Sequence, residues 1–120
     1  MPYQISYDSE AGIMSTRVTG QVDMAMVKTM ASDMHAETVK HDCARFLNDY
    51  RSAIISLRIL DIYELPKLAV LLGTDPTARH AIVVKGETDS IRFFVTVARN
   101  RGQLVRVFTD TDKARAWLLS

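Results

Sequence analysis

A continuous apolar run, Ala-Ile-Val-Val at residues 81–84, narrows the choice of fold more than any other segment. A strand that faces water on one side alternates apolar and polar residues, but this run carries no polar residue on either face. Such runs are typical of strands that lie between helices on both faces of a parallel sheet. The segment 79–85 is therefore expected to be an inner strand of an α/β sheet.

The surrounding segments predict further strands and helices in alternation. Residues 3–8 and 13–19 each alternate apolar and polar side chains, and the turn-forming cluster between them predicts a β-hairpin. Asp23 stands at the N-cap position of a helix that continues to about Lys40. The other expected elements are strands at 44–48 and 104–108, helices at 56–72 and 87–101, and a final helix that begins after Thr109 or Asp110.

This order, β-β-α-β-α-β-α-β-α, predicts an α/β fold in a single domain that spans residues 1–120. Helices that connect successive strands imply crossover connections and hence a mainly parallel sheet. The opening hairpin adds one antiparallel strand, so the expected sheet has five strands. A chain of this length can bury a sufficient core without disulfides or a metal.

Charge and cysteine content narrow the class of protein. Lys and Arg number 15 and Asp and Glu 14, a net charge of +1, whereas DNA- and RNA-binding proteins normally carry a clear basic excess. No nucleic-acid partner is therefore expected. The single cysteine, Cys43, fits a reducing compartment. No apolar run approaches the roughly 18 residues of a membrane span, and no signal sequence opens the chain. We expect a cytoplasmic protein whose only membrane contact would be peripheral.

The segment 57–72 is more apolar than a helix covering one face of a core requires. Two interpretations stay open: a helix largely buried by the core, loops or a dimer partner, and an exposed or openable apolar groove. Pro66 cannot donate a hydrogen bond inside a helix. A short irregular or 3₁₀ turn is therefore expected at 57–61, with a regular helix that begins near Ile62 or Tyr63 and ends at Gly73.

The groove interpretation assigns apolar ligand contacts to two predicted helices. Phe93 and Val97 lie four residues apart, outside the inner stripe of the helix 87–101, where the alternative is packing against a neighbouring helix. In the first helix Met26, Met30 and Met34 share one face, which indicates either core filling or an adaptable wall for a lipophilic guest. The candidate groove residues are Leu60, Ile62, Leu65, Leu68, Phe93 and Val97.

The polar residues do not predict a catalytic or metal site. His35 and His41 are six apart and so fall on different faces of a helix, and His80 begins a strand, so surface or capping roles are expected. Cys43 is expected to be a buried structural thiol. No catalytic residue, metal ligand or cofactor is predicted. An enzyme that uses Asp61 with Tyr63, or a carboxylate near His80, is a further alternative.

Several local motifs resemble one known family. They are Asp-Ile-Tyr-Glu-Leu-Pro at 61–66, Arg-Phe-Phe at 92–94, the segment 96–102, and Arg-Val-Phe-Thr-Asp at 106–110 leading to Ala-Trp-Leu at 116–118. With the element order, they make the chain similar to the SpoIIAA-like group of the STAS superfamily, often described as STAS/SEC14-like. The resemblance implies a SpoIIAA-like fold and a non-enzymatic binding or regulatory role. Its SEC14-like side implies an apolar ligand or a membrane surface.

The resemblance also implies an alternative function. In phosphorylated STAS regulators an Asp-Ser pair opens the second helix, and a partner kinase phosphorylates the serine. This chain has Ser56-Leu57-Arg58 there. A phosphorylation switch of the anti-sigma-antagonist type would use Ser56 or Ser52, where a helix start favours phosphate, and turn or capping duty is the other interpretation. A protein partner and a homodimer are compatible with either function.

Overall fold

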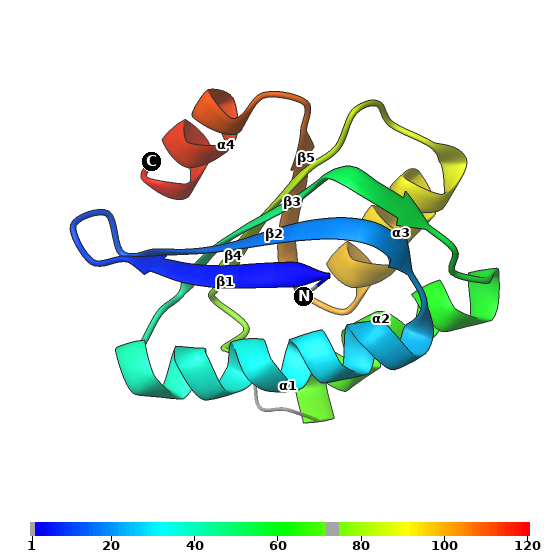
Figure 1. Cartoon of the computed structure of the whole chain (residues 1–120), viewed down its shortest axis with the longest axis horizontal. Coiled ribbons are helices and arrows are strands. Elements are labelled where there is room, and N and C mark those ends of the chain that lie inside the picture. The colour runs from blue at the N-terminus through cyan, green and yellow to red at the C-terminus, as the bar shows by residue number, and fades with distance from the viewer. Residues whose placement is uncertain (1, 72–74) are drawn as a thin grey trace.

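A computed structural model describes residues 2–71 and 75–120, and these residues form an open sheet flanked by helices (Figure 1). The strands and helices follow the predicted order. In chain order they are β1 (Tyr3–Asp8), β2 (Ile13–Val22), α1 (Met24–His41), β3 (Arg45–Ile55), α2 (Ile59–Leu71), β4 (Arg79–Val83), α3 (Asp89–Asn100), β5 (Leu104–Phe108) and α4 (Thr111–Leu118).

The sheet has the strand order β1-β2-β3-β4-β5. The pair β1–β2 is antiparallel, and the other neighbouring pairs are parallel. The hairpin turn is held by Asp8, whose Oδ1 accepts the backbone N–H groups of Glu10 and Ala11, and it closes at Gly12, whose φ of +67° suits glycine. The α/β class and the mainly parallel five-stranded sheet predicted from the sequence are confirmed.

The two faces of the sheet carry different helices. Figure 1 shows α4 on one side of the sheet and α1 with α2 on the other. Because side chains alternate along a strand, β3 supplies both layers. Leu47 packs with Ala114 and Leu118 of α4, whereas Phe46 packs on the other face with Met14 and Cys43. The apolar run in β4 is buried on both faces, as its composition predicts.

Helix α1 begins where the sequence indicates. The Asp23 side chain accepts the backbone N–H of Met26 at 2.8 Å and so caps the helix. Met30 is buried, and Met26 and Met34 are partly buried against the same layer of the core. No helix within the described residues is long and apolar enough to cross a membrane.

The structure corrects two predicted boundaries around the second helix. Strand β3 does not end at residue 48, because it stays paired with β2 as far as the Val22–Ile55 pair. Helix α2 begins at Ile59, without the irregular turn expected at 57–61, and Pro66 therefore lies in its interior. The start is fixed by Asp61, whose carboxylate accepts the backbone N–H of Arg58 at 3.1 Å. The stop expected at Gly73 lies outside the described residues.

Candidate ligand-binding cavity

A cavity of about 420 Å³ lies between the sheet and helices α1, α2 and α3. This volume falls within the roughly 300–1,000 Å³ of small-molecule sites. Most of its lining is apolar and comes from the three helices and the strands beneath them. The apolar lining residues on the helices are Val27, Met30, Ala31, Met34, Val39, Ile62, Leu65, Leu68, Ile91 and Phe94.

The structure brings half of the predicted groove residues together. Ile62, Leu65 and Leu68 line the cavity along one side of α2. Leu60 lies outside the lining and is 72% exposed. The helix begins at Ile59, and two residues correspond to about 200° around its axis, which turns Leu60 away from the face that carries Ile62.

Helix α3 contributes a different pair from the one predicted. Phe93 is half-buried and Val97 is buried, but neither lines the cavity. Ile91 and Phe94, from the inner stripe of the helix, line it instead. Because α3 packs against α2 as well as against β5, burial on this helix does not by itself mean contact with the cavity.

The cavity also has polar groups that the sequence did not assign to a site. Phe46, Asn48 and Tyr50 alternate along β3 and line the cavity from the same face of the sheet. The neighbouring strand β4 adds His80, which is paired with Phe46 in the sheet register. The one available signal was two polar residues on the strand face that Phe46 marks as buried. It was hidden because β3 was expected to end at residue 48.

The environment keeps His80 and Tyr50 neutral at pH 7. Burial lowers the pKa of the His80 imidazole to about 4 and raises the pKa of the Tyr50 phenol to about 12. The surface or capping role expected for His80 is therefore wrong, since the ring lies within the cavity wall.

One polar atom of the cavity wall has no partner. The Asn48 side-chain oxygen Oδ1 is buried, and within the described part of the chain it accepts no hydrogen bond. Leaving such an atom without a partner costs about 1–3 kcal/mol, and most buried polar atoms in native proteins are paired. This atom is the strongest indication that the cavity is completed by another molecule.

The mouth of the cavity lies beside the C-terminal end of α1. The lining residues Val39, Asp42 and Ala44 are exposed there, with Val39 at 70% exposure, and Asp75 is exposed as well. The carboxylate of Asp75 accepts the backbone N–H and the hydroxyl of Thr77, and the backbone N–H is the main cause of its lowered pKa. Cys43 is buried, as predicted, and its thiol donates to the carbonyl of Arg45 at 3.1 Å.

The two serines of the predicted switch lie outside the cavity lining. Ser52 is exposed within β3, so its expected place at a helix start is wrong. Ser56 is exposed in the connection between β3 and α2, and its backbone N–H donates to the carbonyl of Val22 at 2.9 Å. Exposed Ile54 and Ile59 flank this connection.

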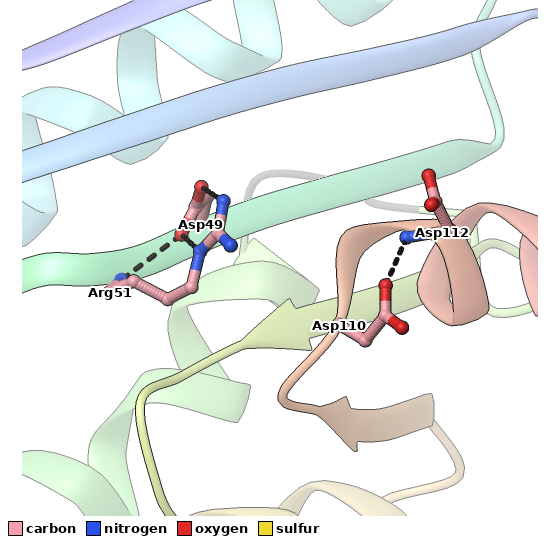
Figure 2. Close-up of polar contacts among 4 residues, drawn as sticks. All are labelled: Asp49, Arg51, Asp110 and Asp112. Atoms are coloured by element: carbon pink, nitrogen blue, oxygen red, sulfur yellow. Dashed lines mark hydrogen bonds and ion pairs between the residues drawn. The ribbon is translucent and has the colours of Figure 1, made fainter.

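A second group of polar residues lies near the start of α4. Figure 2 shows Asp49 paired with Arg51, and Asp110 bonded to the backbone N–H of Asp112. The Arg51 guanidinium holds the pKa of Asp49 below its usual range. Both bonded carboxylates therefore have protein partners. Among residues 2–71 and 75–120, no three His, Cys, Asp or Glu side chains lie close enough together to hold a metal ion.

The pair considered for acid–base chemistry also has structural contacts. The backbone N–H of Arg58 lowers the pKa of Asp61, which stands in the first turn of α2. Tyr63 is exposed, and its ring lies 5.0 Å from the ammonium group of Lys67 and 5.3 Å from the guanidinium of Arg101. Neither residue lines the cavity.

Comparisons with known proteins concern the fold. The sequence matches no protein-family model and no curated protein. Among solved structures, an uncharacterised protein of the DUF3478 family from Shewanella loihica PV-4, described as having a SpoIIAA-like fold, aligns with a TM-score of 0.64 at 17% identity, over 97% of this chain and 93% of that one. The anti-sigma factor antagonist SpoIIAA in its unphosphorylated form aligns with a TM-score of 0.59 at 8% identity, over 97% and 96% of the two chains.

The chain has a SpoIIAA-like fold. The resemblance noted in the sequence motifs is thus confirmed at the level of the fold. At such identities a SpoIIAA-like fold does not carry a function with it, because one fold hosts many functions and function depends on the particular site. The cavity of this chain must therefore be interpreted from its own residues.

Proposed function

We propose that this SpoIIAA-like chain is a non-enzymatic binding module that holds a lipophilic small molecule between its sheet and helices α1, α2 and α3. The observation that carries the proposal is the cavity of about 420 Å³ with its mainly apolar lining. Large, mostly apolar cavities with a few polar groups are the usual form of small-molecule sites. The partly buried Met34 gives the wall a side chain that adapts to irregular shapes.

Binding is favoured over catalysis by the protonation states of the cavity residues. A general acid or base works best when its pKa lies near the working pH. The pKa of His80 is about 4 and that of Tyr50 about 12, so neither group exchanges a proton readily at pH 7. The Cys43 thiol is buried and bonded to a backbone carbonyl. These side chains shape and polarise the cavity wall.

The test is a titration with N-phenyl-1-naphthylamine, an uncharged dye whose fluorescence rises in apolar surroundings. The purified protein is expected to bind it saturably, with one molecule per chain and a micromolar Kd. A linear, unsaturable rise would contradict the proposal, since it would indicate adsorption to surface patches.

Two variants of one helix locate the bound dye. Leu65→Trp places an indole in the cavity and should weaken binding at least tenfold. Leu60→Trp makes the same change on the outer face of α2 and should leave the affinity unchanged. Circular dichroism and thermal melting establish that both variants fold. Equal affinities in two folded variants would place the dye elsewhere and contradict the proposed site.

A second candidate is a phosphorylation-switched regulator that acts through a protein partner. One observation favours it: Ser56 is exposed between two segments that carry the exposed apolar residues Ile54 and Ile59. A phosphate at Ser56 would add charge in the middle of this apolar surface and so change its affinity for a partner. Phosphopeptide mass spectrometry of the protein from its native cells should find phosphate at Ser56 or Ser52. Its absence under all growth conditions would contradict the switch.

The exposed apolar surface around Ser56 also leaves a homodimer and a membrane surface as alternative partners. Sedimentation of the wild type and of Leu60→Asp distinguishes the first, because a dimer built on this surface would dissociate in the variant. Flotation with liposomes distinguishes the second.

A further inference from the structure

The unpaired oxygen of Asn48 indicates which chemical group the cavity ligand carries. Oδ1 is an acceptor, so its partner must be a donor. Asn48 lines the cavity from β3, and its position in the register lies opposite Thr16 of β2 and Ile82 of β4. Thr16 Oγ1 is buried and also lacks a partner in the described residues. The side chain next to Asn48 therefore does not satisfy it.

The charges of the lining indicate that this donor is uncharged. Among the described lining residues there is no lysine or arginine, and the carboxylates are those of Asp42 and Asp75 at the exposed mouth. An anionic headgroup would meet these two carboxylates at the mouth. In the interior it would find no fixed positive charge, and burying an uncompensated charge is costly.

A cationic headgroup is also disfavoured in the interior. The two groups that titrate beside Asn48 on the cavity wall, His80 and Tyr50, are both neutral at pH 7 and supply no negative charge. The Asp75 carboxylate is already bonded to Thr77. The interior is thus uncharged and polar only at a few points.

We propose that the ligand is an uncharged, mainly apolar molecule with a hydroxyl group, and that this hydroxyl donates a hydrogen bond to Asn48 Oδ1. This inference rests on the proposed function and names the ligand class of the same cavity. A site with a buried acceptor discriminates strongly against analogues that lack the donor, because these leave the acceptor unpaired. The apolar lining then supplies affinity and Asn48 supplies selectivity.

The experiment measures displacement of N-phenyl-1-naphthylamine by four molecules with the same ten-carbon chain at pH 8. They are 1-decanol, decyl methyl ether, decanoate and decylammonium. The alcohol is expected to bind about tenfold tighter than the ether, equivalent to about 1.4 kcal/mol, because the ether keeps the oxygen but has no donor. Decanoate and decylammonium should both bind more weakly than the alcohol.

The variant Asn48→Leu removes the acceptor and keeps a side chain of similar size. It should still bind the dye, but the preference for the alcohol over the ether should disappear. Equal affinities for alcohol and ether in the wild type, or tightest binding of either charged molecule, would overturn the inference. The proposed function would survive that result as long as the dye binds and Leu65→Trp weakens it. If the dye does not bind at all, the proposed function itself fails.

Discussion

The imidazole ring of His80 stacks on the phenyl ring of Phe46, with their centroids 5.0 Å apart and their planes 9° from parallel. The two residues are partners in the register of β3 and β4, so the sheet itself holds the rings together. The same burial that allows the stack lowers the pKa of His80 to about 4. A protonated imidazole is therefore not compatible with this part of the cavity wall.

The first prediction is that stability falls as His80 becomes protonated in the unfolded chain. The ordinary pKa is 6.5 and the folded value about 4. Between these values the unfolded state binds the proton and the folded state does not, so stability is lost as the pH drops from 6.5 towards 4. The total loss should be about 3 kcal/mol. Urea denaturation at a series of pH values from 7 to 4 measures it.

The control for this prediction is His80→Phe, which keeps an aromatic ring against Phe46 but does not titrate. The slope of stability between pH 6.5 and 4 should become shallower in this variant. The carboxylates with lowered pKa, such as Asp49, lose their contribution mainly below this range. An unchanged slope in His80→Phe would show that another group causes the pH dependence.

The second prediction concerns the start of α4. The Asp110 carboxylate accepts the backbone N–H of Asp112 at 2.8 Å and thereby pairs one of the free N–H groups of the helix (Figure 2). Asp110→Ala should lower the free energy of unfolding by about 1 kcal/mol, whereas Asp110→Asn, which can also cap, should change it by only a few tenths. Chemical denaturation measures both. Equal losses would mean that charge, rather than capping, is what matters at this position.

The elements of the fold could be predicted because their signals are local. Asp23 caps α1 through a contact within the first helical turn, and the hairpin turn is closed by contacts of Asp8 with residues next to it. Local signals also placed Ile62, Leu65 and Leu68 in one apolar segment, and these residues do line the cavity.

The cavity could be predicted only in part, because its other residues depend on register and phase. Leu60 was assigned to the groove, but the position of Leu60 depends on where α2 begins, and the contact of Asp61 with the Arg58 backbone fixes that start. Asn48 and His80 lie on neighbouring strands but far apart in the sequence, and pattern alone does not show that they share a wall.

The third prediction concerns Arg79, which links β4 to the end of α4. Its Nη1 donates to the carbonyl of Trp117 at 2.7 Å, and its guanidinium lies 5.5 Å from the centre of the indole ring. Arg79→Ala leaves a carbonyl of the last helical turn without this donor and should cost about 1–2 kcal/mol of unfolding free energy. Denaturant melts of the variant and the wild type measure the difference.

A neighbouring arginine provides the matched control for Arg79. Arg106 of β5 also lies over Trp117, at 5.7 Å from the ring centre, and is exposed. Arg106→Ala should therefore cost only about 0.5 kcal/mol, the value of an exposed cation–π contact. Similar losses in the two variants would mean that the hydrogen bond to the Trp117 carbonyl contributes little.

The last prediction uses Cys43 as a reporter of the cavity. Its thiol is buried, lines the cavity close to the exposed residues Asp42 and Ala44, and donates to the carbonyl of Arg45. A neutral reagent such as methyl methanethiosulfonate should react much faster than the dianionic 5,5′-dithiobis(2-nitrobenzoate), when each rate is divided by that of the unfolded chain, because the route to the thiol is apolar and carries carboxylates at its mouth. Saturating 1-decanol should slow the neutral reagent several-fold by filling the cavity. If both reagents showed the same normalised rate, and decanol had no effect, the thiol would be reached by local unfolding rather than through the cavity.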